Sequence, residues 1–105
     1  MLYMKKIQKE VDDWVQQYKL GYFKPLEILA RLTEEVGELA REANHNFGPK
    51  KKKETEDYNN IEDEMSDIVF TLACLANSLN LDMDRGFRKV MDKYNNRDKN
   101  RWEKK

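Results

Sequence analysis

The stretch PLEILARLTEEVGELAREANHN, residues 25–46, decides the fold predicted for this chain. Its apolar side chains recur every three or four residues, which places them on one stripe of a helix: Leu29, Leu32, Val36, Leu39 and Ala43. Pro25 suits the first turn, because the N–H that proline lacks has no partner there. We therefore predict one helix that ends near Asn46, just before Phe47-Gly48-Pro49.

The same spacing predicts a helix before this stretch. It runs from about Met4 to Lys19, and its apolar face carries Ile7, Val11, Trp14, Val15 and Tyr18. Residues 20–24 interrupt it. On the other side of the central helix, residues 48–60 have no apolar period and are rich in lysine and acidic residues, so we predict a mobile connection.

Two further helices are predicted after this connection. The third begins at Ile61 and is apolar on nearly all sides, which is typical of a helix that is central or in an interface. Asp82 is the expected N-cap of the fourth, whose charged end runs to Trp102. Its buried spacing is Phe87, Val90, Met91 and Tyr94. The pattern predicts an all-α fold, a four-helix bundle in a single domain over residues 1–105.

Composition limits the class of protein. The 105 residues include 38% charged side chains, and no apolar run approaches the roughly 20 residues that span a bilayer. A single cysteine, Cys74, excludes an internal disulfide and fits a reducing cytoplasm. The formal net charge is +0, although residues 85–105 hold nine Lys and Arg against three Asp and Glu. This balance argues against binding to a nucleic-acid polymer. We expect a cytoplasmic protein without membrane partners.

Acidic side chains border the apolar stripes of two helices. Glu34, Glu35 and Glu38 lie on the second helix, and Glu64 and Asp67 lie three residues apart on the third. If these helices pack through their stripes, the carboxylates converge, and their repulsion is relieved by a hard divalent cation. The alternative is that they are exposed acids on charge-rich helices.

These residues resemble a known family. Glu34-Glu35-Val36-Gly37-Glu38, followed by Glu64-Met65-Ser66-Asp67, is similar to the EExxE and ExxD motifs of MazG-like nucleotide pyrophosphohydrolases, in the all-α NTP pyrophosphatase superfamily. The resemblance implies Mg²⁺-dependent hydrolysis of nucleoside triphosphates to monophosphate and pyrophosphate, in nucleotide-pool sanitation or control. It implies Glu35, Glu38, Glu64 and Asp67 as metal ligands and Glu34 as a helper.

The chemistry of the residues agrees with that implication. Mg²⁺ prefers oxygen ligands and keeps several waters, so a few carboxylates leave room for phosphate oxygens and an attacking water. Mn²⁺ is an acceptable substitute. The resemblance also places the basic residues Lys93 and Arg97 near the substrate phosphates. These two residues share one face of a helix, and Asn96 next to them is the expected neutral hydrogen-bond partner. The alternative is that they are solvated charges on a basic helix end.

Other sites rank lower. Glu42 and His45 have the Glu-x-x-His spacing of di-iron bundles, but the second copy that such a site needs is missing. Residues 82–86 resemble the start of a calcium loop with glycine one place early. Five aromatic residues could stack on a base, although a packing role is favoured for each of them: Trp14, Tyr22, Phe23, Phe47 and Trp102.

Two expectations concern partners. The third helix has more apolar surface than four short helices can hide, so we expect a homo-oligomer, either a dimer or a tetramer. The competing function is a non-catalytic helical interaction module that binds a partner through this helix. The hypothesis of an interaction module explains the helical bundle, but it does not explain the five acidic residues beside the apolar stripes.

Overall fold

The computed structural model describes residues 3–49 and 60–105. These residues form four helices: α1 (Tyr3–Val15), α2 (Pro25–Phe47), α3 (Asn60–Ser78) and α4 (Met83–Asn96). The all-α fold class predicted from the sequence is confirmed. Most of the predicted connection, residues 50–59, lies outside the described residues. None of the described helices is long and apolar enough to cross a membrane.

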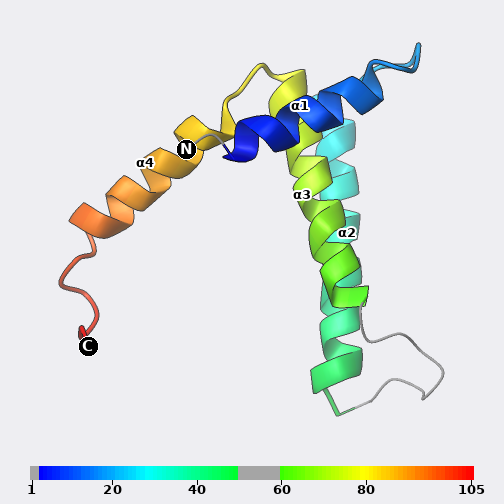
Figure 1. Cartoon of the computed structure of the whole chain (residues 1–105). Coiled ribbons are helices and arrows are strands. Elements are labelled where there is room, and N and C mark those ends of the chain that lie inside the picture. The colour runs from blue at the N-terminus through cyan, green and yellow to red at the C-terminus, as the bar shows by residue number, and fades with distance from the viewer. Residues whose placement is uncertain (1–2, 50–59) are drawn as a thin grey trace.

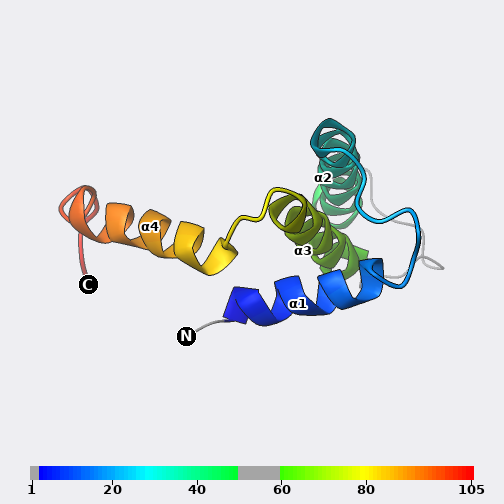
Figure 2. The same cartoon turned by 90° about the horizontal axis from the view of Figure 1, so that it is seen from above.

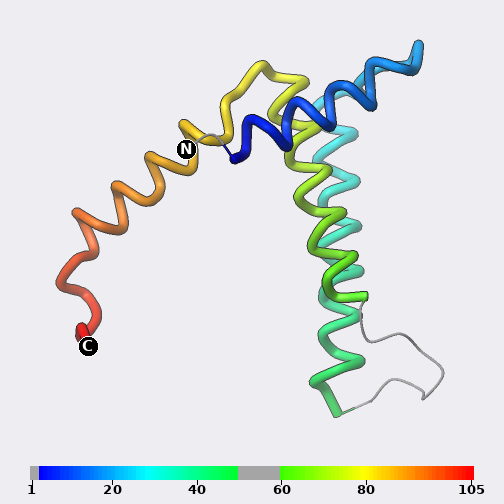
Figure 3. The backbone as a smooth tube through the Cα atoms, viewed as in Figure 1, coloured from blue at the N-terminus to red at the C-terminus, as the bar shows by residue number. Residues whose placement is uncertain are grey.

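Helices α2 and α3 form a long antiparallel pair that is the body of the molecule (Figure 1). The tube view shows the two helices side by side along their length (Figure 3). Helix α1 crosses one end of this pair and packs on α3. Viewed from above, α4 starts near the N-terminus of α1 and leads away from the α2–α3 pair (Figure 2). Helices α2 and α3, which carry the acidic residues singled out in the sequence, are therefore held in place by their contact with each other and by the contact of α1 with α3.

The less exposed face of α2 overlaps the predicted stripe in part, because Leu32, Leu39 and Ala43 belong to both. Leu29 and Val36, expected on that stripe, are about half exposed, at 48% and 49%. The side of α2 that is less exposed carries Ile28, Leu32, Glu35 and Leu39, spaced four, three and four residues apart. This spacing is that of a helix–helix seam. Glu35 therefore occupies a seam position rather than the shoulder of an apolar stripe.

Helix α3 presents a matching seam. Its less exposed residues at three and four spacing are Ile61, Glu64, Ile68, Thr71 and Leu75. Ala73 has no exposed surface and packs with Val11 and Val15 of α1 in the small core. Because α3 faces α2 with one side and α1 with another, its apolar residues are spread around the helix, as the sequence predicted.

The first helix is shorter than predicted. Helix α1 ends at Val15, not at Lys19. The next residues form tighter turns, in which Gln17 N–H donates to Trp14 and Tyr18 N–H donates to the Val15 carbonyl at 3.1 Å. Gly21 then adopts φ +66°, a left-handed conformation that glycine enters without steric cost.

The fourth helix begins as predicted and ends early. The Asp82 side chain accepts hydrogen bonds from the N–H groups of Asp84 and Arg85, so it is the N-cap. The helix ends at Asn96 instead of running to Trp102. There Arg97 pairs with the side chain of Asp98, which follows it, and the chain turns.

Helix α4 contributes little to the core of a single chain. None of its residues is buried, and Phe87, Val90 and Tyr94 are 57%, 40% and 51% exposed. The radius of gyration is 17.3 Å, whereas a compact domain of this length has about 13 Å. The four helices therefore do not close into a compact bundle in one chain, and closure by oligomerisation remains a prediction.

Candidate active site

Three of the predicted metal ligands converge between α2 and α3. Glu35, Glu64 and Asp67 each offer a carboxylate oxygen, and these oxygens lie within 4.8 Å of one another. Glu35 and Glu64 reach this position because both are on the seam, and Asp67 lies one turn after Glu64. The convergence that the sequence predicted is therefore present for these three residues.

The cluster is short of positive charge. Burial, followed by the negative charges of Glu35 and Asp67, raises the pKa of Glu64 above its usual value. The Oε2 atom of Glu64 is buried and has no hydrogen-bond partner among the described residues. Arg31 neutralises part of the charge, because its Nε donates to Glu35 Oε1 at 3.0 Å. An unpartnered oxygen among three hard oxygen donors fits a divalent cation such as Mg²⁺.

The other two predicted acids of α2 lie beside the cluster. Glu38 is half exposed, with one oxygen 3.9 Å from Arg41, and is close enough for its charge to contribute to the raised pKa of Glu64. Glu34 is exposed. The structure thus brings Glu38 near the three converging carboxylates without adding it to their set, and it leaves Glu34 on the surface.

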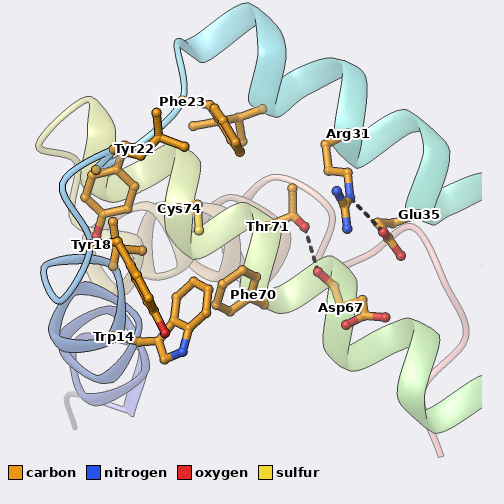
Figure 4. A pocket seen from close by; sticks show the side chains of 14 residues that line it. Trp14, Tyr18, Tyr22, Phe23, Arg31, Glu35, Asp67, Phe70, Thr71 and Cys74 are labelled. Carbon is orange, nitrogen blue, oxygen red and sulfur yellow. Dashed lines mark hydrogen bonds and ion pairs between the residues drawn. The ribbon is translucent and has the colours of Figure 1, made fainter.

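A cavity of about 360 Å³ opens from this cluster (Figure 4). Glu35 and Asp67 line one end, and the other end is aromatic, with Trp14, Tyr18 and Phe70 among its walls. The rings pack edge to face, with centroids 5.1 Å apart for Trp14 and Tyr18 and 5.7 Å apart for Trp14 and Phe70. An aromatic slot beside carboxylates can hold a flat ring next to a metal-bound anion.

Sequence reasoning anticipated only part of this cavity. Trp14, Tyr22 and Phe23, three of the five aromatic candidates for base stacking, line it. Phe47 and Trp102 are 83% and 73% exposed and do not line it. The wall residues Tyr18 and Phe70 and the basic residue Arg31 were missed as site residues. Helical spacing from Glu35 could have found Arg31, since it lies one turn earlier on the same helix.

A polar network fixes the loop that carries part of the cavity wall. Tyr22 Oη donates to Asp12 Oδ1 at 2.6 Å, and Asn77 Nδ2 donates to Tyr22 Oη at 2.9 Å. Gln8 Nε2 in turn donates to Asn77 Oδ1 at 2.9 Å. Burial and the hydrogen bond to Asp12 raise the pKa of Tyr22 to about 12. The loop after α1 is therefore tied to both α1 and α3.

The predicted phosphate-binding residues of α4 are not brought to this cluster within one chain. Lys93 lies with its Nζ 5.2 Å from the ring centre of Tyr94, and Arg97 pairs with Asp98 at 3.0 Å. Asn96 Nδ2 donates to the carbonyl of Asp92. Lys93 and Asn96 lie in the last turn of α4, which leads away from α2 and α3, and Arg97 follows directly after it (Figure 1). Their role in substrate binding stays a prediction.

The lower-ranked sites find no support in the described part of the chain. Its single group of three or more potential ligands is Glu35, Glu64 and Asp67, so Glu42 and His45 are not part of such a group. Asp82 serves as a helix cap. Cys74 is half-buried in the cavity wall, and burial raises the pKa of its thiol, which disfavours the reactive thiolate.

Comparisons with known proteins agree with this geometry. The model of the MazG nucleotide pyrophosphohydrolase domain matches residues 23–102. The chain is 55% identical over 102 residues to the uncharacterized protein YpjD of Bacillus subtilis (strain 168), covering 97% of this chain and 92% of that protein. A crystal structure of Bacillus subtilis YpjD, described as a candidate pyrophosphatase, superposes with a TM-score of 0.82 at 54% identity, covering 88% of this chain and 94% of the other.

A second solved structure is also similar. It is that of the Bacillus-conserved MazG protein, described as a nucleotide pyrophosphohydrolase, with a TM-score of 0.78 and 49% identity. The similarity covers 90% of each chain. Both structures share the arrangement of helices that carries the carboxylate cluster here.

Proposed function

This chain belongs to the MazG nucleotide pyrophosphohydrolase family, and we accordingly propose that it hydrolyses nucleoside triphosphates to nucleoside monophosphate and pyrophosphate with Mg²⁺. The family places the chain among the hydrolases, which favours catalysis over a helical module that only binds a partner. The observation that carries the proposal is the convergence of Glu35, Glu64 and Asp67 at the end of an aromatic cavity.

The metal is proposed to bind Glu35, Glu64 and Asp67, with Glu38 completing the set of four. Glu64 Oε2, buried without a hydrogen-bond partner among the described residues, supports this assignment. When bound, Mg²⁺ or Mn²⁺ supplies positive charge to the phosphates and lowers the pKa of a coordinated water. The half-exposed Glu38 has freedom to turn from Arg41 toward the cluster. Glu34 is the proposed helper from the same helix.

The chain's own residues orient the substrate. The ring of the base is proposed to lie against Trp14, Tyr18 or Phe70, because stacking on aromatic side chains suits every base. The phosphates then extend toward Glu35 and Asp67 at the other end of the cavity. The seam holds Glu35 and Glu64 in position, so little reorganisation is needed when the ligands close on the ion.

Lys93, Asn96 and Arg97 are proposed to bind phosphate oxygens of a substrate held by another copy of the chain. They lie at the end of α4 or, for Arg97, directly after it, and α4 leads away from α2 and α3 of its own chain (Figure 2). Lys93 and Arg97 are four residues apart and border the exposed apolar face of α4, so packing of that face on a partner subunit carries them to the interface. We propose that the same face takes part in the contact between subunits of a dimer or a tetramer.

The biological role proposed from the family is nucleotide-pool sanitation or control in the cytoplasm. Removal of a triphosphate as monophosphate takes it out of the pool that polymerases use. The single cysteine agrees with a reducing compartment.

The test is a product analysis over all natural and several damaged nucleoside triphosphates, with Mg²⁺ and in ¹⁸O water. We expect monophosphate and pyrophosphate in equal amounts. Label in the monophosphate places the attack at the α-phosphorus, and label in pyrophosphate places it at the β-phosphorus. Release of orthophosphate as the first product contradicts the proposal and indicates an ordinary triphosphatase.

A further inference from the structure

Arg31 is the basic residue of the cavity. Among the described residues that line the cavity it is the only Lys, Arg or His, and it lies on α2 one turn before Glu35. Its Nε donates to Glu35 Oε1 at 3.0 Å. Figure 4 shows its guanidinium at the end of the cavity that holds Glu35 and Asp67.

The outer part of this guanidinium is available. The contact with Glu35 uses the inner nitrogen, Nε. The two terminal nitrogens, Nη1 and Nη2, have no hydrogen-bond partner within the described part of the chain. The two terminal nitrogens form a planar fork that matches two oxygens of a phosphate group. Arg31 is thus held by one carboxylate and presents its fork beyond it.

The ion pair itself does not explain why an arginine is here. The Arg31 side chain is 67% exposed, and an exposed pair of this kind contributes little to stability. The Glu35 side chain, in contrast, is only 13% exposed. Glu35 is therefore a largely buried carboxylate that orients an accessible guanidinium at the end of the cavity.

The position of Arg31 along the cavity indicates which part of a bound nucleotide it contacts. Consider a nucleotide whose base lies at the aromatic end of the cavity, against Trp14 and Phe70, and whose outer phosphates lie at the carboxylate cluster. Its first phosphate then lies near the boundary between the aromatic end and the carboxylate end. Arg31 lines the carboxylate end beside Glu35. A phosphate there is also close to several carboxylates, so a fixed cation in addition to a metal ion favours its binding.

We propose that Arg31 is a substrate-binding residue whose terminal nitrogens bind the phosphate group attached to the sugar, with Glu35 as its positioning partner. This inference rests on the proposed function, because it takes a nucleotide as the occupant of the cavity. It assigns to one chain a phosphate contact that does not depend on α4 of another copy.

The test compares equilibrium binding of a nucleoside monophosphate and of its parent nucleoside to the full chain in the presence of Mg²⁺. In Arg31→Gln, the dissociation constant of the monophosphate should rise about tenfold to a hundredfold, as expected for a lost charged hydrogen bond. The dissociation constant of the nucleoside should not change. Arg31→Lys keeps the charge without the fork and should recover part of the loss.

Arg41→Gln is the matched control. Arg41 is on the same helix, has nearly the same side-chain exposure (66%), and also lies beside a carboxylate, but it does not line the cavity. This variant removes the same charge and should keep monophosphate binding. The rise in thermal midpoint on addition of Mg²⁺ without nucleotide should persist in both variants, which shows that the carboxylate cluster is intact.

Three outcomes would overturn the inference: unchanged monophosphate binding in Arg31→Gln, an equal loss for nucleoside and monophosphate, or an equal loss in Arg41→Gln. A wild-type chain that binds the monophosphate no better than the nucleoside would also overturn it. If the wild-type chain released no pyrophosphate from any triphosphate, the proposed function would fail, whereas a selective loss of monophosphate binding in Arg31→Gln would still support the phosphate contact.

Discussion

At the scale of single residues, the informative feature is that two glutamates occupy positions where a helix pair normally places apolar side chains. Glu35 and Glu64 lie on the facing seams of α2 and α3, with Ile28, Leu32 and Ile68 at neighbouring seam positions. Two carboxylates in such positions destabilise the pair unless a cation compensates them. The divalent cation proposed for this site would relieve the part of this repulsion that the ion pair of Arg31 with Glu35 leaves.

This conflict leads to a prediction for Glu35→Gln and Asp67→Asn. We expect millimolar Mg²⁺ to stabilise the wild-type chain. Each variant should lose this stabilisation and triphosphate hydrolysis, because a neutral amide is a weak ligand for a hard cation. The helical circular dichroism should persist. Thermal melts with and without Mg²⁺ measure the first effect.

The matched control is Glu62→Gln, which removes the same charge from an exposed position of α3. It should keep the Mg²⁺-dependent rise in thermal midpoint. A Glu35→Gln chain that melted with the full wild-type response to Mg²⁺ would exclude Glu35 as a ligand.

Tyr22 gives a prediction about pH. Its pKa is raised from 10.0 to about 12, so between these values the folded chain keeps a proton that the unfolded chain has lost. The folded state then binds more protons than the unfolded state, and the free energy of unfolding must fall as pH rises through this interval. Below pH 10 the contribution of Tyr22 is fully present.

Urea unfolding at several pH values measures this effect. Tyr22→Phe should cost about 1 kcal/mol at neutral pH, since it removes the hydrogen bonds with Asp12 and Asn77, and it should weaken the alkaline fall. Tyr3→Phe, at a position that is 64% exposed, is the control and should behave as the wild-type chain. An alkaline fall of equal size in Tyr22→Phe would show that other groups cause it.

At the scale of elements, the N-terminus of α1 is capped by a residue from the other end of the chain. The Asp84 carboxylate accepts from the N–H groups of Met4 and Lys5 at 3.1 and 2.8 Å. The first N–H groups of a helix have no partner within the helix, and an acidic side chain there also complements the helix dipole. Asp84 thus joins α4 to α1.

Asp84→Ala should therefore lower the free energy of unfolding by about 1 kcal/mol, the usual effect of losing a helix cap. Amide hydrogen exchange at Lys5 should become faster, which locates the loss at the start of α1. Asp92→Ala makes the same substitution at an exposed position of α4 and serves as the control. Unchanged exchange at Lys5 in Asp84→Ala would contradict the capping role.

The elements also show what could be predicted from the sequence. The existence of four helices, the start of α2 at Pro25 and the cap at Asp82 follow from local patterns, and the structure confirms them. The face of α2 was predicted in part: Leu32, Leu39 and Ala43 are less exposed as expected, but Ile28 and Glu35 take the places of Leu29 and Val36. Local spacing does not show which of two adjacent faces meets α3.

The site was predictable to the extent that its residues repeat on a helix. Glu35, Glu64 and Asp67 were found from their spacing and from the resemblance to a family. The contacts that join distant parts of the chain were not found, among them Asp84 with Lys5 and Asn77 with Tyr22. Such contacts depend on how helices cross, which a single sequence does not state.

At the scale of the whole molecule, the single chain leaves too much apolar surface in water. Phe87, Val90 and Tyr94 lie on one side of α4 and are all exposed, and the molecule extends over 49 × 42 × 24 Å. Burial of apolar surface is the main favourable term in folding, so we expect a chain with this shape to share that side of α4 with a partner subunit.

We therefore expect light scattering to give a mass of at least twice 12.6 kDa at micromolar concentration. Phe87→Glu should shift this mass toward the monomer and lower the thermal midpoint, because it places a charge in the centre of the shared surface. Lys89→Glu is the control, since it adds the same acidic side chain about 200° around α4. If Phe87→Glu kept the wild-type mass, α4 would not be the interface. If it formed a monomer that still bound Mg²⁺ but no longer hydrolysed triphosphate, the loss would support the supply of Lys93 and Arg97 by a partner subunit.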